Sequence, residues 1–135
     1  MTSELEPCSS ASGKDRNIYV VQRHDATRLH FDLRLEMNGV LKSWAVPKPP
    51  PTEPGIKRLA VEVEDHPLEY ASFEGVIPEG QYGAGTVAIW DKGSYTLLKR
   101  ERNKIAVIFH GEKLRGAYYL IRFREDKNWL LFKKK

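Results

Sequence analysis

The chain has 135 residues, of which 41% are hydrophobic and 30% are charged, and its formal net charge is +4 at pH 7. This length and balance indicate an ordinary soluble globular domain with a sizeable core, and the mildly basic charge favours polyanionic partners. No apolar run is long enough to span a bilayer and the N-terminus lacks a signal-peptide pattern, so we expect a cytoplasmic protein that does not act at a membrane. The single cysteine, Cys8, excludes an intramolecular disulfide and a cysteine metal cluster.

The predicted elements begin after a tail. Residues 1–16 are polar and rich in small residues, which predicts a flexible N-terminal segment, and residues 17–135 are predicted to form one domain. Short segments rich in β-branched and aromatic residues then recur between turn signals; in chain order they read "IYVVQ", "LHFDLRLEM", "VLKSWAV", "RLAVEVE", "GTVAIWD", "SYTLLKR", "KIAVIFH", "AYYLIRF" and "NWLLFKK". So many short strands in so short a chain predict a mostly β fold, a compact single-domain β-barrel with long functional loops and little helix.

The connections between these strands are of two kinds. Tight connections, each marked by Gly, Asn or Asp, are predicted at 38–39, 91–93, 110–112 and 126–128. Two longer segments, 46–55 and 74–86, are rich in Pro or Gly and are predicted to be surface loops that carry function. The second is not a P-loop, because no Lys follows its glycines and no helix follows them, so we interpret it as a shaped turn whose glycines permit positive φ.

The predicted strand "LHFDLRLEM" has an unusual polar face. Successive side chains of a strand point to opposite faces, so one face is apolar and the other carries His30, Asp32, Arg34 and Glu36. His30 and Asp32 lie roughly 7 Å apart along that face, near enough to reach one metal ion. The competing interpretation is a hydrogen-bonded surface pair of His30 with Asp32 beside an ordinary ion pair of Arg34 with Glu36.

Two further features strengthen the metal interpretation of this strand. His24 stands just before it and supplies a second imidazole. Two histidines and one carboxylate leave open positions on a divalent cation, which a catalytic site needs, and Arg34 presents a planar fork suited to phosphate oxygens.

A second group of chemistry-bearing residues lies in "RLAVEVEDHPLEY", residues 58–70. The alternation predicts that Leu59, Val61 and Val63 pack inward, with Ala60 and its even-numbered neighbours on the other face. Pro67 ends the strand, which places His66 and Tyr70 where a loop opens, suited to phosphate contact or proton transfer. The alternative for His66 alone is a solvated strand end. The three tryptophans, Trp44, Trp90 and Trp129, are expected in the core.

Three stretches carry a resemblance to a known family. They are residues 20–48, which contain "HDATRLHFDLRLE", residues 57–91, which contain "EDHPLEY", and "GEKLRGAYYLIRF". Together they closely resemble the 3'-phosphoesterase domain found at the N-terminus of bacterial DNA ligase D and as a stand-alone protein in bacteria and archaea. The resemblance runs from about Ile18 to Phe132, and we see no ligase or polymerase segment, so we expect the free-standing form.

The resemblance implies a compact β-barrel and a manganese-dependent enzyme that heals DNA 3' ends, with Co²⁺ or Zn²⁺ as alternative metals. A phosphodiesterase step removes a 3'-terminal ribonucleoside from a primer-template, and a phosphomonoesterase step then removes the 3'-phosphate to leave a 3'-OH. A DNA ligase or polymerase acting in trans is the implied partner, and a monomer is the simplest expectation.

The resemblance also implies a role for each matching residue. His24, His30 and Asp32 resemble the metal ligands. Arg34 and His66 resemble the groups that hold the scissile phosphate, and Tyr70 resembles a further essential side chain. Lys48 and Arg58 resemble the basic residues that matter most for the monoesterase step. Gln22 resembles a residue that orients the site.

Two other functions fit parts of the pattern. His30 and Asp32 followed by His110, with Arg122 beyond, mimic the metal triad of a 2-oxoglutarate-dependent oxygenase, which is also a β fold. That interpretation leaves His24, Arg34, His66 and Tyr70 without a role. A basic barrel could instead bind nucleic acid without acting on it, but binding does not need His30 and Asp32 to converge on an interior face.

Overall fold

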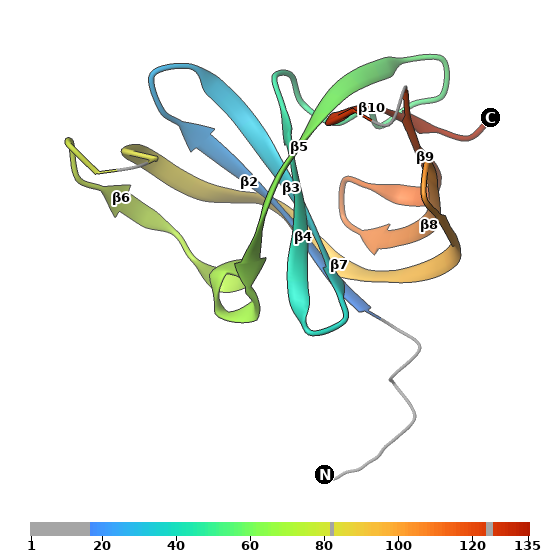
Figure 1. Ribbon diagram of the computed structural model, residues 1–135, viewed down its shortest axis with the longest axis horizontal. Helices are drawn as coiled ribbons and strands as arrows, with labels where there is room; N and C mark the ends of the chain where they lie inside the picture. The colour runs from blue at the N-terminus through green and yellow to red at the C-terminus, as the bar shows by residue number, and fades with distance from the viewer. Residues whose placement is uncertain (1–16, 82, 124–125) are drawn as a thin grey trace, which may run out of the picture.

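The computed structural model describes residues 17–81, 83–123 and 126–135 (Figure 1). The predicted tail, residues 1–16 with Cys8, lies outside the described residues. The elements, in chain order, are β2 (Asn17–Asp25), β3 (Leu29–Met37), β4 (Val40–Val46), β5 (Lys57–Pro67), the 3₁₀ helix η2 (Leu68–Ser72), β6 (Gly75–Ile77), β7 (Gly85–Glu101), β8 (Lys104–Gly111), β9 (Arg115–Arg122) and β10 (Asn128–Lys133). None of the helical structure in these ranges is long and apolar enough to cross a membrane.

The strands form a closed barrel. They are hydrogen-bonded in the order β2-β3-β4-β5-β10-β9-β8-β7, and β7 pairs again with β2, so the sheet returns to its first strand. β6 is attached to the outside of this ring through β7. Every pairing between named strands is antiparallel. The predicted mostly β barrel is therefore confirmed, and closure leaves its eight ring strands without open edges.

The barrel interior is the hydrophobic core. Alternate residues of each ring strand point inward, and the large side chains there are Tyr19, Leu33, Leu35, Trp44, Phe109, Tyr118, Leu120 and Trp129. Trp44 and Trp129 meet edge to face with ring centroids 5.7 Å apart. Both were predicted in the core and are fully buried there, whereas Trp90 is half-buried and packs against the core beside Phe31.

The sequence located one connection correctly and misplaced another. Asn38 and Gly39 have φ of 55° and 85° and join β3 to β4 as a two-residue hairpin, as predicted. The predicted connection at 91–93 is wrong, because β7 runs unbroken through it from Gly85 to Glu101. Gly93 serves close packing instead: a Cβ there would lie 2.7 Å from the carbonyl oxygen of His110 on the neighbouring strand.

The predicted inward face of β5 is also wrong, and Val63, expected in the core, lines the outer pocket described below. Ala60 is completely buried, whereas Leu59 is 41% exposed. The neighbouring strand decides this, because Trp129 of β10 points into the core and pairs directly with Ala60. A small residue beside a large inward indole fits the available space, and no pattern within β5 reveals it.

A second layer covers part of the barrel's outer wall. β5 crosses in front of β3 and β4 and leads into η2 and β6 (Figure 1). Gln22 of β2 donates to the carbonyl oxygens of Tyr70 and Phe73, and Tyr70 of η2 and Ile77 of β6 line one pocket with polar residues of β2 and β3. The polar residues of β3 point to this outer side, because Phe31, Leu33 and Leu35 fill the interior. His30 and Asp32 therefore converge on the outer wall beneath the second layer, and the expectation of an interior face is corrected.

Candidate active site

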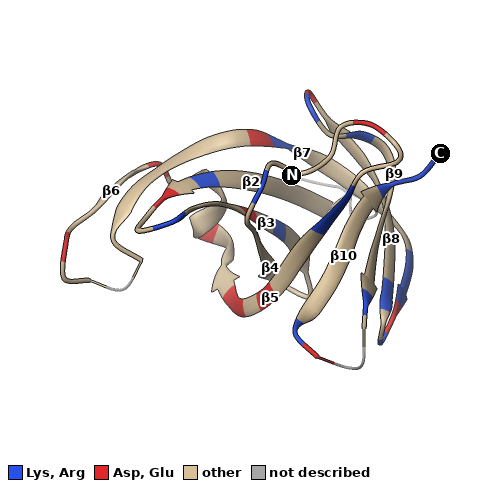
Figure 2. Ribbon diagram, turned by 90° about the horizontal axis from the view of Figure 1, so that it is seen from above, with Lys and Arg blue, Asp and Glu red and all other residues tan. Residues whose placement is uncertain are grey.

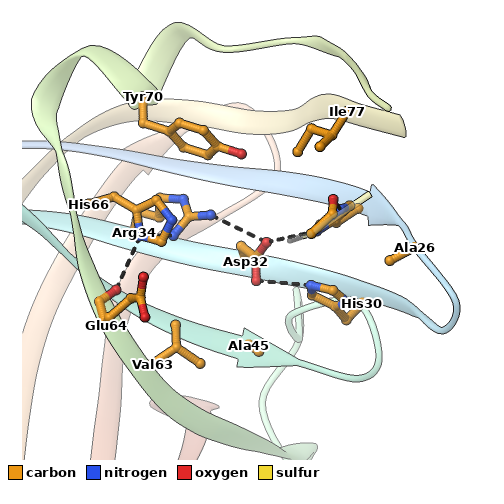
Figure 3. A pocket seen from close by; sticks show the side chains of 12 residues that line it. Ala26, His30, Asp32, Arg34, Ala45, Val63, Glu64, His66, Tyr70 and Ile77 are labelled. Carbon is orange, nitrogen blue, oxygen red and sulfur yellow. Dashed lines mark hydrogen bonds and ion pairs between the residues drawn. The ribbon is translucent and has the colours of Figure 1, made fainter. Parts of the chain in front are cut away.

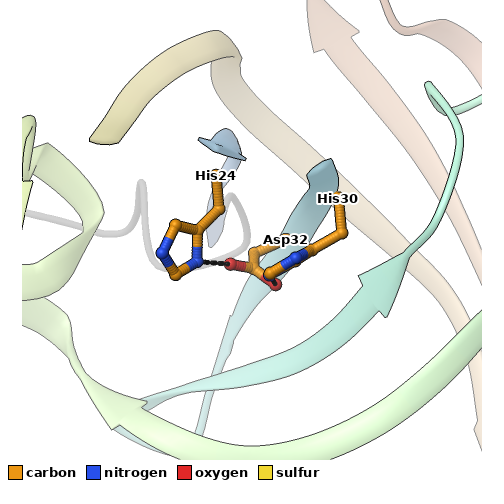
Figure 4. A group of neighbouring side chains, drawn as sticks. All are labelled: His24, His30 and Asp32. Atoms are coloured by element: carbon orange, nitrogen blue, oxygen red, sulfur yellow. Dashed lines mark ion pairs between the residues drawn. The ribbon is translucent and has the colours of Figure 1, made fainter. Parts of the chain in front are cut away.

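The three predicted metal ligands form one cluster on the β2–β3 hairpin. His24 pairs directly with His30 across the two strands, and Asp32 follows on the same face of β3. One candidate ligand atom from each residue lies within 4.8 Å of the other two (Figure 4). Asp32 Oδ2 is 3.6 Å from His24 Nδ1, and Asp32 Oδ1 is 3.3 Å from His30 Nε2. The antiparallel pairing of β2 with β3 thus brings His24 beside His30 and Asp32, although His24 is on a different strand.

Backbone carbonyls orient both imidazole rings toward this cluster. His24 Nε2 lies 2.7 Å from the carbonyl oxygen of Gly83, and His30 Nδ1 lies 3.2 Å from that of Arg28. A carbonyl oxygen can only accept, so each of these ring nitrogens must carry the proton. The opposite nitrogens, His24 Nδ1 and His30 Nε2, face Asp32, and in the neutral form of each ring they carry the lone pair. Such carbonyl contacts are what holds metal-binding histidines in place in other proteins.

Three electron-rich groups that converge in this way need a positive charge among them. Without a metal, the hydrogen bond with Asp32 favours a proton on His30: it raises the pKa of that ring and outweighs burial, which lowers it. A divalent cation would replace that proton, because histidine binds metal only in its neutral form. The mixed nitrogen and oxygen donors fit a transition metal such as Mn²⁺, Co²⁺ or Zn²⁺.

Arg34 lies next to the cluster (Figure 3), and polar groups from several elements hold it. Its Nε donates to Gln22 Oε1 at 2.7 Å and its Nη1 donates to Ser43 Oγ at 2.8 Å. Its Nη2 lies 3.4 Å from Asp32 Oδ2. The side chain is nearly fully buried, and burial lowers its pKa against the opposing effect of Asp32. An arginine keeps its charge under such conditions, so Arg34 is a fixed cation in the pocket wall.

Gln22 connects Arg34 to the second layer. While its Oε1 accepts from Arg34, its Nε2 donates to the carbonyl oxygens of Tyr70 at 2.8 Å and Phe73 at 3.1 Å. The Tyr70 ring stacks on Phe73 and faces the Arg34 guanidinium at 4.9 Å. Burial raises the pKa of the Tyr70 hydroxyl, which keeps its proton at neutral pH. These contacts fix η2 over the pocket.

His66 faces the same pocket from the end of β5. Burial and the nearby Arg34 charge both lower its pKa, so the ring is neutral near pH 7. Its Nδ1 lies 3.1 Å from Arg34 Nη1 and also 3.1 Å from the carbonyl oxygen of Glu64. The first contact requires Nδ1 to accept and the second requires it to donate, so each tautomer makes one of them. When Nδ1 accepts from Arg34, Nε2 carries the proton.

These side chains line one pocket of about 420 Å³. Its wall includes His24, His30, Asp32, Arg34, His66 and Tyr70, together with Val63, Ile77 and small residues (Figure 3). The pocket therefore combines a candidate cation site with a fixed guanidinium and a neutral imidazole, an arrangement suited to a phosphate ester.

Comparison with known proteins gives the same indication. The family described as the DNA Ligase D 3'-phosphoesterase domain matches this chain over residues 22–122. The chain belongs to this family.

Its relatives are much longer proteins. The multifunctional non-homologous end joining protein LigD of Pseudomonas aeruginosa is 53% identical over 125 residues, which cover 87% of this chain and 15% of the relative. The LigD proteins of Mycobacterium tuberculosis and Mycolicibacterium smegmatis are 47% and 48% identical over 96% and 99% of this chain, and over 17% and 19% of their own lengths. The chain thus spans less than a fifth of these relatives, and the similarity extends before Ile18.

Not every predicted residue lines the pocket of this phosphoesterase domain. Gln22 lies behind Arg34 rather than in the wall, as an orienting residue would. Lys48 and Arg58 lie together in a separate pocket of about 230 Å³ at the start of β5. The oxygenase triad is not formed, because His110 is exposed on β8, where it contacts Thr96, and it is outside the ligand cluster found among the described residues.

Sequence reasoning missed three contributors to the site. Ser43 holds Arg34, and its signal is positional, because it pairs directly with Arg34 across β3 and β4. Gly83 and Arg28 act through backbone carbonyls, so their side chains give no signal.

Proposed function

We propose that this chain is a metal-dependent phosphoesterase that heals DNA 3' ends. Its substrate is a primer-template whose primer ends in a 3' ribonucleotide or a 3'-phosphate. A phosphodiesterase step removes the ribonucleoside, and a phosphomonoesterase step then leaves a 3'-OH for a ligase or polymerase acting in trans. Family membership supports this proposal, as do relatives whose names place them in non-homologous end joining.

The observation that carries the proposal is the convergence of four groups in one pocket. Candidate ligand atoms of His24, His30 and Asp32 lie within 4.8 Å of one another, and Arg34 places a positive charge 3.4 Å from Asp32. His24, His30 and Asp32 would hold the cation, whose Lewis acidity polarises a phosphoryl oxygen. Because the Arg34 guanidinium is locked before substrate arrives, it can neutralise negative charge as it develops on the phosphoryl group without reorganising.

His66 is assigned to the leaving oxygen of the diesterase step. Water adds to phosphorus, and the bond to the 5' oxygen of the terminal ribonucleoside breaks, so negative charge develops on that oxygen. With Nδ1 accepting from Arg34, the Nε2–H of the neutral His66 ring can donate a hydrogen bond to it, while solvent supplies the proton that it finally takes. A donor that is positioned before the reaction stabilises such charge without reorganising. Tyr70 holds the other side of the pocket, against both His66 and Arg34.

Lys48 and Arg58 are assigned to the monoesterase step. Both lie outside the main pocket, and Arg58 is fixed by donation from its Nε to the carbonyl oxygen of Pro49 at 3.0 Å. A phosphate monoester carries more negative charge than a diester, so added positive charge favours the second step.

The test uses a 5'-labelled DNA primer that ends in one ribonucleotide and is annealed to a longer template. With Mn²⁺, Co²⁺ or Zn²⁺ in separate reactions, the wild-type chain should convert this end to a 3'-phosphate and then to a 3'-OH, and EDTA should stop both steps. His30→Ala should be inactive, whereas His110→Ala, a matched histidine outside the pocket, should keep full activity. Conversion by His30→Ala, or none by the wild type with any of the metals, would contradict the proposal.

A further inference from the structure

A basic and aromatic surface extends along the outer wall of the barrel, away from the candidate active site. It consists of two pockets that share Lys57. The first, of about 230 Å³, is completed by Pro47, Lys48, Arg58 and Leu59. The second, of about 400 Å³, is completed by Gly55, Ile56, Tyr119, Phe132 and the three lysines 133–135. We call these two pockets together the β5–β10 surface.

Strand register orders the residues of this surface, and β5 connects it to the catalytic pocket. Lys57 pairs with Phe132, and Phe132 pairs with Tyr119, so the three residues form a row across β5, β10 and β9. Tyr119 and Phe132 point outward, because their strand neighbours Tyr118, Leu120 and Leu131 fill the core, and Lys57 is exposed. Val63 of the catalytic pocket lies on β5 four residues beyond Leu59, roughly 13 Å away by strand geometry.

The two aromatic rings are suited to contact with nucleic-acid bases. The Tyr119 and Phe132 centroids are 5.6 Å apart, and both rings are half-buried on the outer wall. Lys57 Nζ lies over the Phe132 ring at 5.5 Å and Lys104 Nζ lies over Tyr119 at 5.1 Å. Stacking of a base on an aromatic ring is stronger than an exposed cation–π contact, so a base can displace each ammonium group, which is then free to pair with a phosphate.

The loop beside these pockets is fixed to the barrel. Tyr118 Oη donates to the carbonyl oxygen of Pro51 at 2.6 Å, and Lys133 Nζ donates to that of Thr52 at 3.4 Å. Pro54 also forms a bridge with Lys133. A surface whose shape exists before binding loses less conformational entropy when a ligand arrives.

The charge of this surface is strongly positive. Its six basic side chains are Lys48, Lys57, Arg58 and the lysines 133–135, and the nearby acidic residue on the loop is Glu53. Figure 2 shows the basic positions at the start of β5 close to those at the C-terminal end. Exposed apolar side chains, Ile56 and Leu59, lie among them. Positive charge interleaved with apolar and aromatic groups matches single-stranded nucleic acid, whose phosphates and unpaired bases alternate.

We propose that the β5–β10 surface binds an unpaired stretch of the nucleic-acid substrate, with its phosphates on the lysines and its bases on Tyr119 and Phe132. This inference rests on the proposed action on DNA ends and adds a second point of contact, outside the catalytic pocket. A fully paired duplex stacks its bases on one another and cannot use the two rings.

The test is binding of a fluorescently labelled single-stranded 15-mer and of a blunt duplex, by anisotropy in EDTA, so that no turnover occurs. Phe132→Leu and Tyr119→Leu keep apolar bulk but lose the ring, and each should weaken single-strand binding about tenfold while leaving duplex binding unchanged. Lys57→Ala should lower the slope of log affinity against log salt by about 0.7. Thermal unfolding of each variant confirms that it is folded.

Two matched controls lie outside the surface. Phe123→Leu removes an exposed ring next to β9, and Lys99→Ala removes an exposed lysine paired with Glu101 on β7; both should bind like the wild type. The inference is overturned if the leucine variants bind the single strand as the controls do, if duplex binding falls equally, or if polyglutamate competes as well as the oligonucleotide. Ring-dependent binding without 3'-end processing would uphold the surface and reject the proposed function, whereas processing without ring-dependent binding would do the reverse.

Discussion

Two buried aspartates of this barrel have opposite surroundings. Asp32 on β3 is 6% exposed and Asp91 on β7 is 5% exposed, so burial does not distinguish them. Their partners do. Asp32 faces a pocket in the company of two imidazoles and a guanidinium, and Asp91 is enclosed by hydrogen-bond donors.

Each carboxylate oxygen of Asp91 accepts two hydrogen bonds. Its Oδ2 accepts from the hydroxyl of Tyr19 at 2.6 Å and from the backbone N–H of Leu114 at 2.9 Å. Its Oδ1 accepts from the N–H groups of Glu112 and Lys113, both at 3.2 Å. The carboxylate therefore fixes the connection between β8 and β9. Burial and the bond to Asp91 together raise the pKa of Tyr19, which stays a donor.

Asp32 lacks such short bonds. Its contacts with His24, His30 and Arg34 are all between 3.3 and 3.6 Å, longer than any of the four bonds that Asp91 accepts. A carboxylate that is buried and loosely contacted on the wall of a pocket retains lone pairs for a ligand. The two aspartates therefore differ in the number and length of the hydrogen bonds that they accept, and this difference distinguishes a structural carboxylate from one available for chemistry.

The largest expected difference between variants of the two aspartates is in their activity. Asp32→Asn should lower the rate of 3'-end processing by about 10³-fold or more, because it removes a charged ligand of the proposed cation. Asp91→Asn should process ends within about threefold of the wild type per folded molecule, measured at a temperature where the variant is folded. Equal losses in the two variants would show that the surroundings do not separate the roles.

For stability we expect the opposite order, with the greater loss in Asp91→Asn. Asp91→Asn turns one acceptor oxygen into a donor and leaves buried N–H or O–H groups without partners, at about 1–3 kcal/mol for each. We therefore expect the free energy of unfolding in urea to fall by about 3–5 kcal/mol. Asp32→Asn should cost less, since Arg34 keeps its bonds to Gln22 and Ser43. A greater loss for Asp32→Asn would contradict the structural role of Asp91.

We also expect Mn²⁺ to stabilise the Asp91 variant far more than the Asp32 variant. Mn²⁺ at about 100 times its dissociation constant should raise the free energy of unfolding of the wild type by about 2.7 kcal/mol. Asp91→Asn should gain as much, because its ligand cluster is intact, and Asp32→Asn should gain far less. Thermal unfolding with and without the metal measures all three. An equal gain in Asp32→Asn would place the cation elsewhere.

The parts of this site that the sequence predicts are those that local geometry determines. Alternation along β3 is enough to separate core from site, and the β2–β3 hairpin then places His24 opposite His30. The strand faces and the ligand set depend on neighbours in sequence, so a pattern of period two reveals them.

The rest depends on contacts between distant segments. Asp91-Lys92-Gly93 has the composition of a turn, yet Asp91 stabilises a different turn more than twenty residues later, and Gly111 allows this because a Cβ there would collide with Tyr19 Oη. The inward position of Ala60 likewise follows from Trp129 on another strand. Such features are set by packing across the barrel, which composition and periodicity do not encode.

The smallest predicted effect is the pH dependence that His30 confers. The hydrogen bond with Asp32 raises the folded-state pKa of His30 above its ordinary value of about 6.5. Without metal, its stabilising contribution is therefore complete below about pH 6.5 and is lost as the pH rises through the raised pKa. With Mn²⁺ the sign reverses, because the metal competes with that proton and binds more tightly as the pH rises.

The difference in unfolding free energy between the wild type and His30→Gln isolates this effect from His66, whose lowered pKa acts in the opposite sense. That difference should decrease with pH in EDTA and increase with pH in Mn²⁺. The same trend in both solutions would mean that the proton and the cation do not share one place beside Asp32.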